Sequence, residues 1–490
     1  MSATDSDPRE GSDAPHESSD DPIEVSMAEL ERQAAQDTGS DAAVPAGDIL
    51  GATDSHVEES DDDLVLFREP SGIESAEVST SALTSETKKR RQRPLRIIVV
   101  SGAKGGVGKT VFSANLAIYL ATIGRRVVLV DADADGASLH TLLGIDRPGR
   151  RLSASSMPPE ELSVAHAVET TVPGLQLVHG GIDEPALGRH RRTSRRALLA
   201  ALRSLDADHL VVDLGTGTSR SLLDFWLAAD QRVFLATPEP TSIDNTYRFL
   251  RAAYARFLKD RAKERGVSGR LTAWLRRMGN TPAPLDLARR LEAAGDDLSE
   301  LVRDATESFD FRLVLNQARV RADLELGEAM TSAARRRFGI ELGYLGYVDY
   351  DDTVWNTIRI RRPLLVESPG TKAAKSIEKI ARRLLAIDAG TAPKRRVRHV
   401  PAESHHDLLE VERGASEEEV RRSFKRLKEI YSPGSLSCYG LFDATSLEAL
   451  RARLEEAYDV LLDPARRRPY ELSVFPRAEE PISPPDAGDE

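Results

Sequence analysis

A glycine- and lysine-rich run near residue 100 has the composition of a phosphate-binding loop. Residues 101–110 read SGAKGGVGKT, follow the apolar run 97–100 and precede a helical apolar pattern that begins at Phe112. Glycine lets backbone N–H groups close around phosphate oxygens, and the start of the following helix adds about half a positive charge. A G-x-x-x-x-G-K-T motif between a strand and a helix therefore indicates a phosphate loop. The residues expected to bind the nucleotide are Gly105, Gly106, Val107, Gly108, Lys109, Thr110 and Val111.

Acidic residues at the ends of two further apolar runs complete the expected site. Asp131 and Asp133 end one run, and Asp213 ends another in the Walker B form. In open α/β sheets, the carboxyl ends of the strands face the crevice in which ligands bind. Lys109 is expected to reach the β- and γ-phosphates, while the Thr110 hydroxyl and Asp213 are expected to hold Mg²⁺.

The second lysine of the loop, Lys104, makes the motif more specific. K-G-G-x-G-K-T resembles the deviant Walker A sequence of the MinD/ParA family of ATPases. The resemblance implies that Lys104 reaches across an ATP-bound homodimer to the partner's nucleotide. It also implies that Asp133 positions or activates the attacking water, that Asp131 lies near the metal, that the N–H of Gly217 senses the γ-phosphate and that the Asn316 amide contacts adenine.

The resemblance covers about residues 96–385, except for a stretch at 251–309, and is nearest to the MinD and FlhG branch. It departs at Ser138, where the family has asparagine, and after Asp213, where the chain reads LGTG and lacks the family's proline.

The family resemblance implies an enzyme, a slow ATPase that a partner protein stimulates. Such a chain would use ATP and Mg²⁺ to dimerise and would position a division, flagellar, chromosomal or polar structure. A non-catalytic, nucleotide-dependent scaffold is the alternative. An ATP-dependent carrier of metal clusters would need cysteine ligands, and the single cysteine, Cys438, lies outside the ATPase region. We expect a cytoplasmic protein, with peripheral association at the membrane or pole, or contact with DNA, left open.

The chain around these residues alternates short β-branched runs with helical patterns, which predicts a mostly parallel sheet flanked by helices, a P-loop NTPase of the α/β class. A polar, arginine-rich, largely helical insertion at 251–309 interrupts the alternation, and a closing helix is expected at 371–387. The strands are expected at 96–100, 127–131, 175–178, 209–213, 232–237, 311–316 and 344–348.

The remaining segments differ sharply in composition. Residues 1–87 hold 23 Asp or Glu and 3 Arg, a net charge of −20 within a total of −12, so the rest of the chain is mildly basic. A segment so acidic and so poor in aromatic residues cannot offset its ordering entropy, which predicts a disordered tail over 1–93. The ATPase domain is then expected over 94–387, followed by a linker at 388–404, a helical module at 405–475 and a disordered tail at 476–490.

The C-terminal module resembles a DnaJ-type J domain over roughly 65 residues. Ser416 and Glu419 form a capping box that starts one helix, and a second helix is expected near 447–462. The His-Pro-Asp tripeptide that stimulates the chaperone ATPase is replaced by Ser-Pro-Gly after Tyr431. The interpretation is a degenerate J-like hairpin that binds a partner and lacks co-chaperone activity.

Overall fold

The computed structural model describes residues 94–133, 136, 138–147, 167–179, 202–203, 205–278, 282–389 and 404–475. The expected tails at 1–93 and 476–490, and most of the expected linker, lie outside the described residues.

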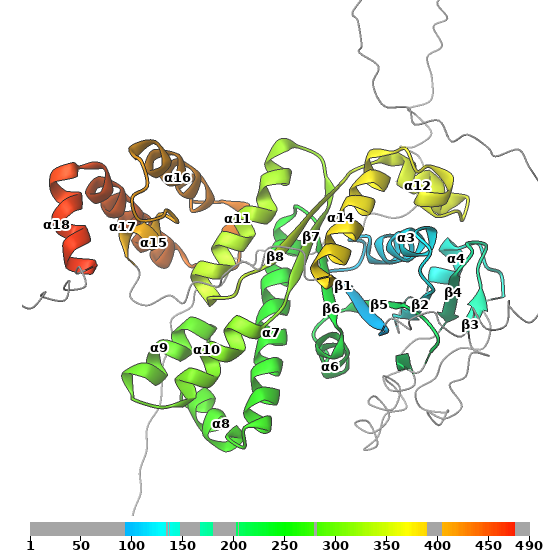
Figure 1. Cartoon of the computed structure of the whole chain (residues 1–490), viewed down its shortest axis with the longest axis horizontal. Helices are drawn as coiled ribbons and strands as arrows, with labels where there is room; N and C mark the ends of the chain where they lie inside the picture. Colours follow the sequence, from blue (N-terminus) through cyan, green and yellow to red (C-terminus); the bar gives the residue numbers. More distant parts are fainter. Residues whose placement is uncertain are drawn as a thin grey trace, which may run out of the picture. The chain divides into compact units, whose positions relative to one another are not determined.

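The centre of the fold is an eight-stranded sheet with the order β3-β4-β2-β5-β1-β6-β7-β8, in which only β3 runs antiparallel to its neighbour (Figure 1). The predicted fold class, with its seven expected strands, is confirmed. The short edge strand β3 was not predicted. The bounds are β1 Arg96–Gly102, β2 Val127–Ala132, β3 Ala167–Glu169, β4 Leu175–His179, β5 His209–Thr216, β6 Gln231–Ala236, β7 Arg312–Ala318 and β8 Gly343–Asp349.

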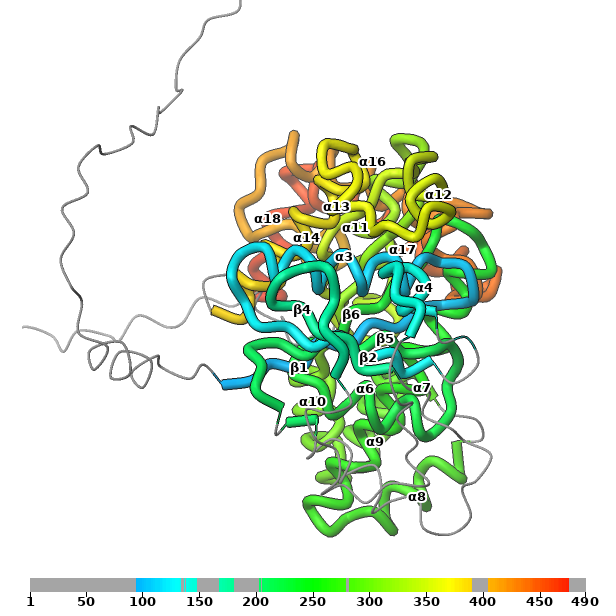
Figure 2. Tube along the Cα trace, turned by 90° about the vertical axis from the view of Figure 1, so that its right-hand side faces the viewer, coloured from blue at the N-terminus to red at the C-terminus, as the bar shows by residue number. Residues whose placement is uncertain are grey.

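Helices cover both faces of the sheet because its central strands are apolar on both sides. Strand β5 shows the pattern: Leu210 and Val212 belong to one buried cluster, while Val211 belongs to the other. The cluster that contains Val211 packs under α3 (Lys109–Thr122), α4 (Leu139–Leu142), α13 (Leu364–Glu367) and α14 (Lys372–Asp388), and the other packs under α6 (Arg220–Ala228), α7 (Pro240–Glu264) and α11 (Arg321–Phe338). Figure 2 shows α3 and α14 on the opposite side of the sheet from α6 and α7.

The register of the parallel strands aligns the ends that carry polar residues. Asp131 of β2 pairs with Asp213 of β5 on one side and with His179 of β4 on the other. Since alternate residues of a strand point to opposite faces, all three side chains lie on the α3 face, as their neighbours Leu129, Val211 and Leu177 do. The edge of the sheet that leads into the phosphate loop therefore presents a row of titratable groups.

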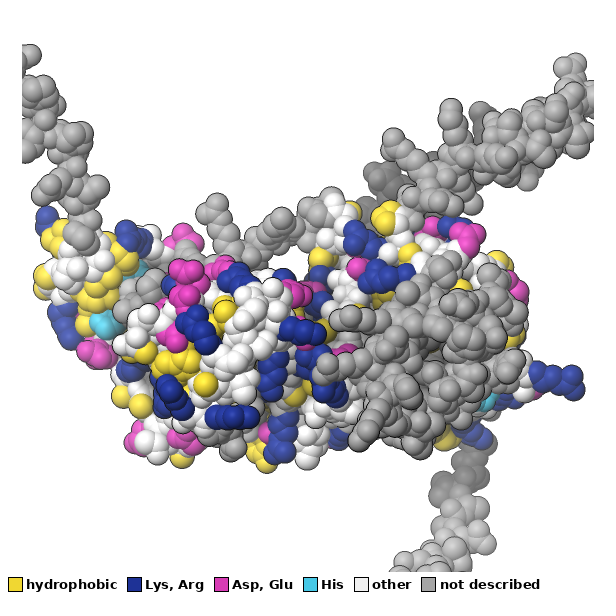
Figure 3. Space-filling view, turned by 90° about the horizontal axis from the view of Figure 1, so that it is seen from below, with side chains coloured by type: hydrophobic (Ala, Val, Ile, Leu, Met, Phe, Trp, Pro, Cys, Tyr) yellow, Lys and Arg dark blue, Asp and Glu magenta, His cyan; other side chains and the backbone are white. Residues whose placement is uncertain are grey.

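The arginine-rich insertion is helical, as expected, but its proposed start at residue 251 lies inside α7, which continues without a break. Helices α8 (Ser268–Arg277), α9 (Pro284–Ala293) and α10 (Leu298–Ser308) follow. Several of its arginines are paired; Arg270, for example, lies 2.7 Å from Asp296. On the face in Figure 3, the described Lys and Arg side chains alternate with acidic and apolar ones rather than forming one basic field.

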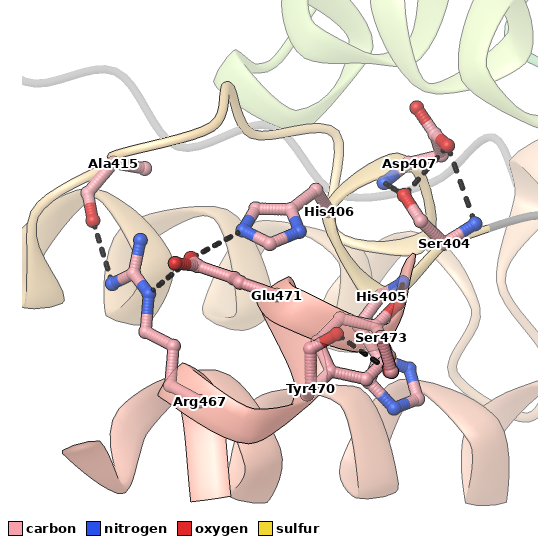
Figure 4. Close-up of polar contacts among 9 residues, drawn as sticks. All are labelled: Ser404, His405, His406, Asp407, Ala415, Arg467, Tyr470, Glu471 and Ser473. Atoms are coloured by element: carbon pink, nitrogen blue, oxygen red, sulfur yellow. Dashed lines mark hydrogen bonds and ion pairs between the residues drawn. The ribbon is translucent and has the colours of Figure 1, made fainter. Parts of the chain in front are cut away.

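The C-terminal module consists of α15 (His405–Leu408), α16 (Glu417–Ile430), the 3₁₀ turn η4 (Leu436–Cys438), α17 (Ala444–Leu462) and α18 (Pro464–Val474). The expected capping box at Ser416 and Glu419 is present. Polar contacts tie α18 to the start of the module (Figure 4): Arg467 donates to the Ala415 carbonyl at 2.9 Å, and Glu471 lies 3.2 Å from His406 Nε2.

The module contacts the domain that contains the sheet through α11 and α7. The Ser332 hydroxyl of α11 donates to Glu410 at 2.7 Å, and the buried Tyr247 hydroxyl of α7 donates to the Ser437 carbonyl at 2.5 Å. Tyr431, which precedes the Ser-Pro-Gly turn, is fully buried, and its ring lies under the Arg336 guanidinium. The end of α16 at Tyr431 therefore faces α11 of the same chain.

Among the described helices, none has the length and apolar character needed to cross a bilayer. Helix α12 (Asp352–Arg359) completes the rim beside the phosphate loop.

Candidate nucleotide-binding site

The phosphate loop joins β1, which ends at Gly102, to α3, which begins at Lys109. Gly106 and Gly108 have φ values of 80° and 86°, in the left-handed region that favours glycine. A Cβ on Gly108 would also lie 2.3 Å from the Asn316 side-chain nitrogen. The loop can therefore follow this path only with glycine, and its N–H groups lie at the start of α3.

Lys109 and Asp213 form the charged floor of this loop. Lys109 is 7% exposed and Asp213 is 1% exposed. Burial raises the pKa of Asp213 to about 7, although hydrogen bonds from the hydroxyls of Thr110 and Ser113 and the charge of Lys109 favour its ionised form. The Ser113 hydroxyl donates to Asp213 Oδ1 at 3.0 Å. A buried carboxylate whose charge is incompletely compensated is suited to a divalent cation, which fits the expected Mg²⁺ ligands Thr110 and Asp213.

Lys104 is held by the side chain of Glu239, which lies just before α7. The lysine is about one-third exposed and the glutamate about half exposed, so the ion pair lies at the surface of the loop. In this conformation the ammonium group of Lys104 is directed toward its own chain.

Asp133 lies against the loop that follows Asp213. A Cβ added to Gly215 would lie 2.8 Å from Asp133 Oδ1, so the carboxylate occupies space that only glycine leaves open. The Gly215 carbonyl accepts a hydrogen bond from the Ser101 hydroxyl at 3.0 Å, which connects this loop to β1. Gly217 has a φ of 100°, and a methyl group added there would meet nothing within 4 Å among the described residues, so this glycine stands clear of its neighbours.

The sheet register places Asp131 beside Asp213, but the carboxylate of Asp131 accepts its hydrogen bond from the start of α4. Asp131 Oδ2 accepts from the Leu139 N–H at 3.0 Å. Burial raises the pKa of Asp131 to about 6, opposed mainly by that backbone hydrogen bond.

Asn316 closes the other side of the loop. Its amide donates to the Val107 carbonyl at 2.8 Å, and the neighbouring Gln317 amide donates to the Gly106 carbonyl at 3.2 Å. A pocket of about 260 Å³ opens here, between the phosphate loop and the end of β8. Its lining includes Gly106, Gly108, Val111, Phe112, Asn316, Gln317, Tyr350, Val354 and Trp355.

Sequence reasoning missed two contributors to this site. Ser113, one helical turn after Lys109, binds Asp213; a lone serine on an apolar helix face was the available signal. Nothing in the sequence pairs Glu239 with Lys104, 135 positions away.

The matches between this chain and known proteins lie mainly in the part of the chain that forms this site. A ParA family model, described as NUBPL iron-transfer P-loop NTPase, matches residues 94–255. The chain is 24% identical to antiactivator FleN of Pseudomonas aeruginosa, over 59% of this chain and 86% of FleN. It is 40% identical to the chromosome partitioning protein ParA of Caulobacter vibrioides, over 24% of this chain and less than half, 44%, of that protein. The septum site-determining protein MinD of Pyrococcus horikoshii, solved with Mg-ADP, aligns with 61% of this chain and 99% of its own, at 19% identity and a TM-score of 0.40.

Proposed function

Because the chain contains a P-loop NTPase domain of the ParA/MinD family, we propose that it is an ATP-hydrolysing dimerisation switch that positions a cellular structure. The name of ParA, a chromosome partitioning protein, supports a positioning role at family level.

The preformed phosphate loop carries this proposal. Its glycines hold the backbone N–H groups open, Lys109 supplies a buried positive charge, and Asn316 borders a pocket on the side where the base would lie. Thr110 and Asp213 would hold Mg²⁺, which would neutralise charge on the bound phosphates. The chain's own groups bind and orient the triphosphate, and Asp133 would accept a proton from the attacking water.

The ion pair between Lys104 and Glu239 supports a switch between two states of this lysine. In the single chain, Glu239 neutralises Lys104. In a dimer the same ammonium would have to leave Glu239 to reach the partner's nucleotide. Because both side chains are substantially exposed, the pair is worth only about 0–1 kcal/mol, so bound ATP can readily displace it.

Opposite changes at this ion pair test the dimer switch. Lys104→Ala is expected to abolish the shift from monomer to dimer that ATP and Mg²⁺ produce in light scattering after gel filtration. Glu239→Gln frees the same lysine and is expected to lower the ATP concentration at half-dimerisation by up to roughly fivefold, the equivalent of about 1 kcal/mol. Equal masses with and without ATP in the unmodified chain would refute the switch.

A substitution at Gly215, which lies against Asp133, can distinguish an ATP-hydrolysing switch from a non-catalytic scaffold. Gly215→Ala is expected to slow phosphate release roughly 10- to 100-fold with little change in ATP affinity, because the new methyl group displaces the Asp133 carboxylate by about 1 Å or less. Gly269→Ala in α8, where a methyl group meets nothing within 4 Å, is the control. An unmodified chain that binds ATP but releases no phosphate, even with its partner, would favour the scaffold instead.

A role as a carrier of metal clusters is less well supported, although the matching family model is described as an iron-transfer P-loop NTPase. Cys438 is the single cysteine of the chain and lies in the C-terminal module. Burial raises the pKa of its thiol to about 12, and the thiol donates to the Ile430 carbonyl at 3.3 Å. We infer that the thiol is structural and that the J-like module serves contact with proteins, starting with its own ATPase region.

A further inference from the structure

Three side chains with metal-ligating atoms meet beside the phosphate loop without belonging to it. Asp131 ends β2, His179 ends the adjacent β4, and His140 lies on α4. One carboxylate oxygen and one ring nitrogen from each histidine all lie within 4.8 Å of one another. The sheet register pairs Asp131 with His179 directly, so the backbone fixes two of the three positions.

The buried carboxylate of this cluster has an unused oxygen. Asp131 is 1% exposed, and while Oδ2 accepts the Leu139 N–H, Oδ1 has no hydrogen-bond partner in the described part of the chain. A buried carboxylate oxygen without a partner is costly and calls for an explanation.

The histidine on α4 likewise has a buried nitrogen without a hydrogen-bond partner among the described groups. His140 Nε2 lies 3.2 Å from the Thr141 hydroxyl, whereas the buried Nδ1 has no partner among the described groups. The rings of His140 and His179 meet edge to face, with their centroids 4.8 Å apart.

We propose that Asp131, His140 and His179 form a second metal site, for a divalent transition metal with Zn²⁺ as the best fit. Two imidazoles and one carboxylate, with a fourth position left for water, form a ligand set typical of zinc. Mg²⁺ prefers oxygen ligands alone and is poorly suited to this set.

The distances require the side chains to move closer together. Tetrahedral ligands at roughly 2.0–2.2 Å from Zn²⁺ lie about 3.3–3.6 Å apart, so atoms now within 4.8 Å of one another need to close by up to about 1.5 Å. Rotation of the half-buried histidine rings can supply this movement.

The two histidine ligands distinguish this site from the expected Mg²⁺ position, although Asp131 is the register neighbour of Asp213. Asp213 is served by Thr110, Ser113 and Lys109, on the side of the phosphate loop. Asp131 has its histidines on the other side, toward β4. In the sequence, Asp131 and His140 lie on either side of Asp133, so a metal held by both would be bound by neighbours of that carboxylate.

Metal binding to the full chain, prepared without a histidine tag, tests the proposal in the absence of nucleotide. After treatment with chelator and with excess Mg²⁺ present, the unmodified chain is expected to bind one equivalent of Zn²⁺, and Co²⁺ as a probe is expected to give visible absorbance of a low-coordinate site. His140→Ala and His179→Ala should each weaken binding by more than the roughly 10- to 100-fold that loss of an outer-shell partner costs.

Two further variants give the experiment its controls. His405→Ala, which changes a histidine of the C-terminal module, should bind the metal as the unmodified chain does, and so should Lys109→Ala, which removes the phosphate-loop lysine. Zn²⁺ should also raise the melting temperature of the unmodified chain but not that of His140→Ala. Equal binding by the unmodified chain and His140→Ala, no binding by either, or loss of binding in Lys109→Ala would each overturn the second site.

Discussion

Lys109→Ala is expected to lose retention of ATP, with at least a roughly 100-fold weaker affinity. Lys109 is 7% exposed and begins α3, so its side chain is already largely desolvated where the phosphate loop meets the helix. Removing a buried partner of a charged group costs about 2–5 kcal/mol, and 2.7 kcal/mol corresponds to a factor of about 100. Equilibrium dialysis with ATP and Mg²⁺ measures the loss.

The control for this variant is Lys259→Ala, at an exposed position of α7. ATP with Mg²⁺ should raise the melting temperature of the unmodified chain and of Lys259→Ala, because a ligand that binds only the folded state stabilises it. Lys109→Ala should melt as a folded protein but show no such rise. Unchanged affinity in Lys109→Ala would show that this loop is not the phosphate site, and the dimer switch would fall with it.

The fold was predictable because its strands are buried on both faces. A strand such as 127–132 reads as a continuous apolar run that ends in a carboxylate, which distinguishes it from the helices that flank it. The edge strand Ala167–Glu169 has only three residues, two of them half-buried, and offers no such pattern.

The site was predictable only where its residues are close in sequence. The phosphate loop is a continuous motif, whereas the partners of its side chains come from distant segments. Glu239 meets Lys104, and Gly215 makes room for Asp133, through a register that the sheet alone establishes. The sequence does not identify His179 as a candidate metal ligand, because only the register of β4 with β2 places it beside Asp131.

The contact between the C-terminal module and α11 is a further feature that the sequence did not predict, because it joins residues that are distant in sequence. Composition suggests a linker and a separate module, yet the buried core continues from the ATPase region into the module, from Phe338 to Tyr431. A single carboxylate, Glu410, accepts hydrogen bonds from Ser332 at 2.7 Å and from Arg426 at 2.5 Å and pairs with Arg335. Its φ of 53° is strained for a residue other than glycine, and the contacts of its carboxylate offset that strain.

Glu410→Gln is expected to destabilise the chain by about 3 kcal/mol at pH 7. Burial alone would raise the pKa of Glu410, but Arg335, Arg426 and Ser332 outweigh it and lower the pKa to about 2, against an ordinary value of 4.5. A difference of about 2.5 units corresponds to roughly 3 kcal/mol of stability. Urea unfolding at pH 7 measures the loss, with Glu418→Gln in an exposed pair on α16 as the control, where about 0.5 kcal/mol or less is expected.

The dependence of this loss on pH identifies its cause. Because the folded-state pKa of Glu410 is depressed, its stabilisation is complete above pH 4.5 and disappears as the pH falls toward 2. The difference between the unmodified chain and Glu410→Gln should therefore shrink by roughly 2 kcal/mol between pH 7 and pH 3. Removal of packing alone would give a difference that does not change with pH. A constant difference would therefore show that the charge of Glu410 does not anchor the module to α11.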